Sequence, residues 1–243
     1  MAPYIFMERG GIHIIDLHKT AELLDKAAAA IKQIAKSGRK ILFVATKKQA
    51  KEIVAEKVQA VSMPYITERW SGGMLTNFPT VRKAVKKLSS IEKMEADGTM
   101  AQLSKREQLQ INRQYDKLKK NLGSIADMAK TPAALFVIDV AKEHIAVKEA
   151  HRLHIPVFGM VDTNSNPNDV DFVIPANDDA ANSIAIVLDV ITNAIAEGIA
   201  ERKNDKDVDN KDAKAAVAHN KPRKTRARKA DGKAENTAEE SAE

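Results

Sequence analysis

Hydrophobic residues along the chain follow two patterns, short continuous apolar runs and longer stretches with apolar positions three or four residues apart. The continuous runs predict buried strands, and the longer stretches predict amphipathic helices. The run KILFVA at 40–45 is followed by a helical stretch at 46–61, and AALFVIDV at 133–140 is followed by one at 143–154. Strands that alternate with helices are typical of a parallel sheet covered on both faces. The pattern therefore predicts an α/β fold.

Further elements extend this alternation to both ends of the chain. In chain order they are a hairpin of 4–6 and 12–15 closed by Gly10 and Gly11, a helix over 20–38, short strands at 64–67, 156–161 and 172–175, and a long helix over 178–203. Thr20 is the expected N-cap of the first helix, and Gly38 is expected to end that helix by adopting a left-handed backbone conformation. Acidic residues at the start of the last helix suit the helix dipole.

Residues 80–123 depart from the alternation, because two helical patterns follow each other with only a short turn between them. Each helix has one apolar face: Val81, Ala84, Val85, Leu88 and Ile91 in the first, and Leu103, Ile111, Tyr115, Leu118, Leu122 and Ile125 in the second. The two faces are expected to pack together, and Ser104 and Glu107 have capping-box spacing. This predicts a helical hairpin that projects from the body, with arms about 25–28 Å long at about 1.5 Å per residue.

The expected organisation is an α/β body at 1–79 and 124–202, the hairpin as an insertion at 80–123, and a tail at 203–243. Aromatic and large aliphatic residues nearly vanish from the tail, which predicts a disordered, charged segment. Its stretch KPRKTRARK has six basic residues in nine. An arm that lies along phosphates and a solubilising tail both fit that composition.

The net charge of +6 is unevenly distributed along the chain. Residues 1–123 carry 23 Lys and Arg against 12 Asp and Glu, whereas residues 124–202 carry 5 against 12. Solvated charge without a partner explains the total but not this segregation. The asymmetry favours a polyanion, nucleic acid above all, as the partner of the first half.

The residue composition excludes several classes of protein. The chain has no cysteine, which excludes thiol catalysis, disulfides and thiolate zinc sites and suits a reducing cytosol. No apolar run approaches the roughly 18 residues of a membrane span, and the first residues do not read as a secretory signal. The sequence predicts a soluble, cytoplasmic protein.

The loop RWSGGMLTNF at 69–78 stands between the short strand and the basic hairpin. Its arginine can bind phosphate, its tryptophan offers a stacking plane, its glycines allow close approach or positive φ, and its asparagine can contact a base edge. A buried tryptophan that anchors the base of the hairpin is the alternative interpretation. The residues that carry this hypothesis are Arg69, Trp70, Gly72, Gly73 and Asn77.

Two further groups of residues suggest chemistry at the carboxyl edge of the sheet. Thr46 and Lys47 stand where a strand leads into a helix, a position that attracts phosphate, although the usual glycines are missing. Asp162, Asp178 and Asp179 follow neighbouring strands, so they are expected to converge as candidate ligands of a divalent cation, with helix capping as the alternative for the last two. No serine–histidine–acid set and no paired general acid and base are found.

Three segments of the chain resemble a known family. They are MAPYIF.ERGGIHIIDL.KT, RWSGGMLTNFPTVRK, and PAALFVIDVAKEHIAVKEAHRLHIPVFGMVDTNSNPNDVDFVIPANDDA, where the dots stand for Met7 and His18. On these motifs the chain is similar to the ribosomal protein S-two family over residues 1 to 202. Members usually carry a further GVHFGH-like stretch before the position of Met1, and they often have glycine where this chain has Ala45.

The resemblance implies a three-layer αβα, flavodoxin-like body with a coiled-coil hairpin, and a structural, non-enzymatic role in the small ribosomal subunit. It implies 16S rRNA and other small-subunit proteins as partners, with recruitment of ribosomal protein S-one. The residues expected to face RNA outside the RWSGGMLTNF loop are Arg39, Lys47, Lys48, Arg82, Lys83, Lys86, Lys87, Arg106 and Arg113. The alternative function is a flavodoxin-like enzyme that binds a phosphorylated ligand at the Thr46 turn.

Overall fold

The computed structural model describes residues 1–219, and the basic stretch at 221–229 lies outside them. The chain divides into two units, Met1–Asn204 and Asp205–Glu243, and the sheet, the hairpin and the sites discussed below all lie in the first. The predicted division of that first unit into a body and an insertion stays a prediction. The last helix continues to His219, beyond the position at which the tail was expected to begin.

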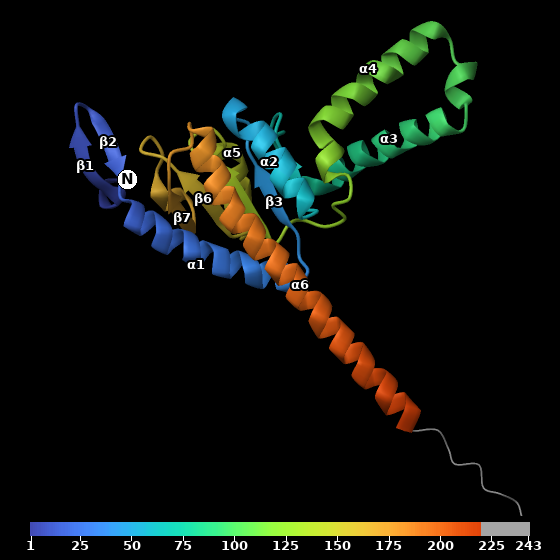
Figure 1. Ribbon diagram of the computed structural model, residues 1–243. Coiled ribbons are helices and arrows are strands. Elements are labelled where there is room, and N and C mark those ends of the chain that lie inside the picture. The colour runs from blue at the N-terminus through green and yellow to red at the C-terminus, as the bar shows by residue number, and fades with distance from the viewer. Residues whose placement is uncertain (220–243) are drawn as a thin grey trace, which may run out of the picture. The chain divides into compact units, whose positions relative to one another are not determined.

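The core of the first unit is a parallel sheet of five strands (Figure 1). From one edge to the other these are β4 (Tyr65–Ile66), β3 (Ile41–Val44), β5 (Ala134–Ile138), β6 (Val157–Val161) and β7 (Phe172–Pro175). In order of appearance this is 2-1-3-4-5, the flavodoxin-like order. The expected α/β, three-layer flavodoxin-like fold is confirmed.

Two helical layers cover the sheet, because its strands are apolar at every position and must be buried on both faces. Helices α1 (Leu17–Lys36), α2 (Lys48–Ala60) and α6 (Ala181–His219) pack on one face. Helix α5 (His144–Arg152), the RWSGGMLTNF loop and the base of the hairpin pack on the other. Alternate side chains of β3, Phe43 and Leu42, enter the two cores respectively.

The N-terminal hairpin of β1 (Ile5–Arg9) and β2 (Ile12–Ile15) turns at Gly10 and Gly11, both with positive φ, as predicted. The expected cap of helix α1 was wrong, because α1 begins after Asp16, whose side chain accepts the bond from the N–H of His18. The hydroxyl of Thr20 instead donates to the carbonyl of Pro175 at 2.6 Å, which ties α1 to strand β7.

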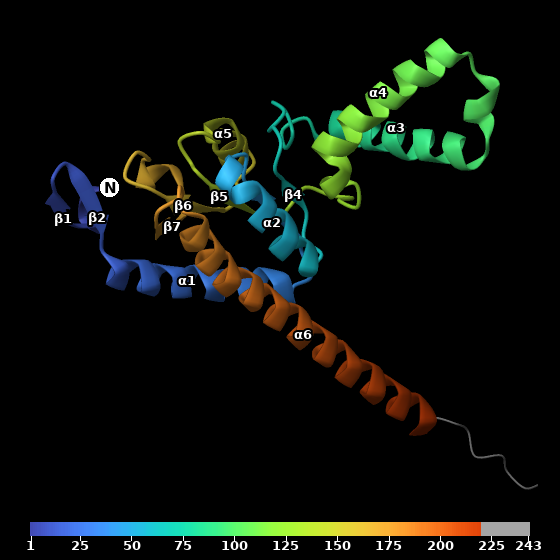
Figure 2. The same cartoon turned by 45° about the horizontal axis from the view of Figure 1, so that its top comes forward.

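The predicted hairpin consists of α3 (Phe78–Ala96) and α4 (Lys105–Leu122), joined through a short 3₁₀ turn, Thr99–Gln102. In both views it extends away from the sheet (Figures 1 and 2). All residues of the two predicted apolar stripes are buried or half-buried. Both halves of the capping box of Ser104 and Glu107 are formed.

Helix α6 is long and apolar enough over Ala181–Asp205 to cross a membrane, as judged by length and composition alone, although the sequence patterns predicted no such span. Its residues Ile184, Leu188, Ile191 and Ile195 are fully buried against the sheet and helix α1. Its polar face forms ion pairs with neighbouring helices, such as those of Glu197 and Glu201 with Lys32 of α1. This is the arrangement of a core helix.

Candidate RNA-binding surface and the carboxyl edge of the sheet

The RWSGGMLTNF loop folds around one carboxylate, that of Glu149 on helix α5. Its Oε1 accepts from the indole Nε1 of Trp70 at 3.1 Å and from the N–H of Gly73 at 2.7 Å. Its Oε2 accepts from the N–H groups of Leu75 and Thr76 at 2.9 and 3.1 Å, and from the Thr76 hydroxyl at 3.2 Å. Backbone N–H groups that could have held a phosphate therefore hold a carboxylate of the chain itself.

These donors determine the charge of Glu149, which is only 7% exposed. Burial raises its pKa, but the N–H groups of Leu75, Thr76 and Gly73 and the indole outweigh burial, so the pKa lies below its ordinary value. Glu149 is therefore ionised at neutral pH. Its negative charge joins the loop to α5 and fixes the start of the hairpin.

Trp70 and Gly73 consequently serve the fold, in agreement with the alternative interpretation of a buried anchor. Trp70 is 7% exposed, and Gly73 has a φ of +84°, a conformation in which a side chain would be strained. Arg69, Gly72 and Asn77 are exposed and remain candidates for contact with RNA.

The Thr46 turn lies at the carboxyl edge of the sheet, between strands β3 and β5, where the strand order reverses. The Thr46 hydroxyl donates to the carboxylate of Glu143, and Lys142 Nζ donates to the Thr46 carbonyl at 3.3 Å. The hydroxyl and the carbonyl of Thr46 thus have partners within the chain. A ligand phosphate at this turn would meet the Glu143 carboxylate.

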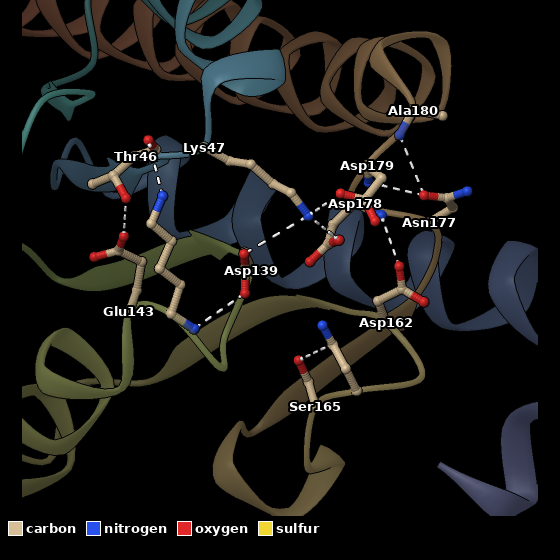
Figure 3. Close-up of polar contacts among 12 residues, drawn as sticks. Thr46, Lys47, Asp139, Glu143, Asp162, Ser165, Asn177, Asp178, Asp179 and Ala180 are labelled. Carbon is tan, nitrogen blue, oxygen red and sulfur yellow. Dashed lines mark hydrogen bonds and ion pairs between the residues drawn. The ribbon is translucent and has the colours of Figure 1, made fainter.

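Lys47 points into a group of aspartates (Figure 3), although its position in the sequence predicted that it faces RNA. Its Nζ lies 2.7 Å from Asp178 Oδ1, 2.6 Å from Asp179 Oδ1 and 3.8 Å from Asp139 Oδ2. Burial lowers the pKa of Lys47, but its bonds to Asp178 and Asp179 outweigh burial and raise it. Lys47 is thus a half-buried internal counter-ion, whereas Lys48 is exposed.

The three aspartates predicted as metal ligands do converge. One oxygen each of Asp162, Asp178 and Asp179 lies within 4.8 Å of the others. Asp178 is fully buried, and its Oδ2 has no hydrogen-bond partner, so the donor set fits a hard cation in part. The helix-capping alternative was wrong, because the side chain of Asn177 accepts from the N–H groups of Asp179 and Ala180.

The ammonium group of Lys47 forms ion pairs with two of these carboxylates, those of Asp178 and Asp179. We therefore expect it to compete with a divalent cation for these ligands. Replacing Lys47 by methionine should increase the affinity of the full chain for Mn²⁺ at least about tenfold, because it removes a positive charge beside the carboxylates. Isothermal titration calorimetry measures this. Lys48→Met, the exposed neighbour, is the matched control and should bind as the unchanged chain does. Equal affinity in both variants would contradict a cation site at these aspartates.

The predicted RNA-facing residues of the hairpin are all exposed, whereas its apolar stripes are not. They are Arg82, Lys83, Lys86, Lys87, Arg106 and Arg113. Over 78–122 the chain carries 11 Lys and Arg against 5 Asp and Glu. Arg82 also donates to the carbonyl of Ala129 at 2.5 Å, which fastens the hairpin to the body. Arg39 lies far along the chain from the hairpin, in the exposed turn before β3.

The comparisons with known proteins agree with the resemblance over nearly the same residues. The family model described as Ribosomal protein S2 matches residues 1–198. Small ribosomal subunit protein uS2 of Phocaeicola vulgatus is 63% identical over all of this chain and 88% of its own length. The protein of that name from Bacteroides fragilis is 62% identical over all of this chain and 88% of its own length. The one from Flavobacterium johnsoniae is 63% identical over 91% of this chain and 88% of its own length. The chain therefore belongs to the ribosomal protein S2 family.

Proposed function

We propose that this chain is a structural component of the small ribosomal subunit, and that it docks on 16S rRNA through its hairpin. One observation carries the RNA part. The hairpin buries its apolar stripes and leaves its lysines and arginines exposed on two helices that extend from the body. Charges of this kind neutralise RNA phosphates and position a protein without reading base sequence.

The proposal includes the partners and location expected of such a component. Most of the acidic segment 124–202, which carries 5 Lys and Arg against 12 Asp and Glu, faces solvent or neighbouring small-subunit proteins, because it would repel RNA. Ribosomal protein S-one is one such partner. The protein is located in the cytoplasm, as part of the ribosome.

The family assignment and the Thr46 turn both stand against the enzyme alternative. The S2 family is one of ribosomal structural proteins rather than enzymes. At the turn itself, Glu143 and Asp178 place negative charge where a phosphorylated ligand would have to bind.

Sedimentation with small ribosomal subunits tests the proposed function. The tagged full chain is expressed in bacteria, and lysates are separated on sucrose gradients at rising salt. We expect the chain to sediment with small subunits at low salt and to be released as salt rises, because screening weakens contacts with phosphates. A chain that stays at the top of the gradient at every salt concentration would contradict the proposal.

A further inference from the structure

A second basic surface lies at the amino edge of the sheet, on the body rather than on the hairpin. It is a hollow of about 460 Å³ between the turn after α1, the end of α2 and helix α6. Its lining includes Arg39, Lys40, Arg202 and Lys203 and, among the described residues, no aspartate or glutamate. We call these four residues and the hollow between them the amino-edge groove.

The fold sets the position of the cations in the amino-edge groove. Gly38 has a φ of +76°, and a Cβ built on it would lie 1.9 Å from Cζ of Arg202, so the guanidinium group packs directly on the Gly38 backbone. Lys40 Nζ donates to the carbonyl of Ser62 at 2.5 Å. Arg39 and Lys203 are exposed at the rim. Arg202 and Lys40 are thus held in place, whereas Arg39, whose Nε donates to the Ser37 hydroxyl at 3.0 Å, and Lys203 are exposed to a ligand.

Two acidic residues of α6 are paired with lysines outside the lining of the groove. Glu201 precedes Arg202, but its carboxylate binds Lys32 at 2.9 Å and Lys36 at 3.3 Å. Glu197, one turn earlier, binds Lys32 at 2.8 Å. Because these carboxylates are paired with lysines of α1, Glu197 and Glu201 do not cancel the positive charge of the groove.

The amino-edge groove continues toward the hairpin. A second hollow, of about 410 Å³, shares Lys40, Ser62 and Met63 with it and reaches Tyr65 and the segment 123–128 at the base of α4. The two hollows therefore form one track from helix α6 to the point where the hairpin leaves the body. An RNA strand bound along the hairpin would reach the amino-edge groove over this track, passing the Asp127 carboxylate in the second hollow.

We propose that the amino-edge groove binds the sugar–phosphate backbone of an RNA strand that also contacts the hairpin. This inference rests on the proposed function. Guanidinium and ammonium groups bind phosphate, and the apolar floor of Val61, Met63 and Ile199 offers a surface for ribose. Within the part of the chain that the structure describes, the lining contains no aromatic residue, so the groove positions the strand without a stacking platform that would read its bases.

The test compares two pairs of exposed cations. One variant is Arg39→Gln with Lys203→Gln in the groove, and the control is Lys148→Gln with Arg152→Gln on helix α5, which removes the same charge from the opposite face of the sheet. Affinity of the full chain for 16S rRNA is measured by filter binding over a range of salt concentrations. Urea denaturation confirms that both variants remain folded.

We expect the groove variant to bind about tenfold more weakly than the control at about 0.1 M salt. Its slope of log affinity against log salt should be shallower by about 1.4, because two phosphate contacts to a single strand are lost. Equal affinity and slope in the two variants would overturn the inference. So would an unchanged affinity for RNA together with lost binding of a polyglutamate peptide, which would assign the groove to an acidic protein.

The hairpin variant Lys83→Glu with Lys87→Glu separates this inference from the proposed function. If the unchanged chain binds rRNA and the hairpin variant does not, while the groove variant binds like its control, only the groove inference fails. If the unchanged chain does not bind rRNA at any salt concentration, both fail.

Discussion

Replacing Glu149 by glutamine is expected to lower the free energy of unfolding by about 3 kcal/mol or more, which would be the largest effect of a single substitution in the body. Five donors converge on the carboxylate, from Trp70, Gly73, Leu75 and Thr76. An amide of the same shape offers one oxygen and turns its NH₂ group toward two or three of these donors. Urea denaturation at pH 7 measures the loss. Glu56→Gln, an exposed glutamate of α2, is the matched control and should change stability by less than about 0.5 kcal/mol.

The same substitution has a defined pH dependence. The pKa of Glu149 is lowered in the folded chain, so its ionised form contributes stability above the ordinary glutamate pKa of about 4.3. That contribution is lost as pH falls through the lowered, folded-state pKa. The difference between the unchanged chain and Glu149→Gln should therefore be constant near neutral pH and shrink in acid below about pH 4. A difference that stayed the same down to the acid limit of folding would show that the carboxylate charge is not what holds the loop.

Reversing two charges on the hairpin is expected to reduce assembly into small subunits by a factor of about 100 or more. Lys83 and Lys87 are four residues apart on α3, are exposed and face the same side. Changing both to glutamate replaces two attractions to phosphate by two repulsions. Arg82 is left unchanged because it fastens the hairpin to Ala129. The measurement is the fraction of tagged chain that sediments with small subunits when it competes with the unchanged chain.

The matched control for this reversal is Lys148→Glu with Arg152→Glu, also four residues apart and exposed, on helix α5. It changes the net charge by the same amount in the acidic segment, so it should assemble nearly as well as the unchanged chain. If the hairpin variant assembled as well as this control, contact between the hairpin and rRNA phosphates would be refuted, although the family assignment would stand.

Local patterns in the sequence predicted most of the fold. Continuous apolar runs marked the strands, apolar spacings of three and four marked the hairpin helices, and Ser104 with Glu107 marked the start of α4. These patterns predict secondary structure because each of them depends only on residues that are close together in the sequence. The cap of α1 was missed, because Asp16 and Thr20 both suit that position and only the contact of Thr20 with Pro175 distinguishes them.

The candidate sites were less predictable, because their partners are far apart in the chain. Glu149 lies 76 residues from Gly73, and Lys47 lies 131 residues from Asp178. A glycine-rich loop and a lysine at a strand end suit an external phosphate and an internal carboxylate equally well. One signal could have identified Glu149: it follows two apolar helix positions, Ala146 and Val147, on the side of α5 that must face the sheet. A buried carboxylate there requires donors.

The central claim is that the hairpin, and not helix α5 in the acidic segment, lies against rRNA. Because the chain has no cysteine, a single one can carry a tethered iron chelate that cleaves nearby RNA. Ser90→Cys on α3 and Arg152→Cys on α5 are both at exposed positions. With the chain bound to 16S rRNA, strand cleavage should occur from the probe at residue 90 and be absent from the probe at residue 152. Cleavage from residue 152 alone, or equal cleavage from both, would contradict the account.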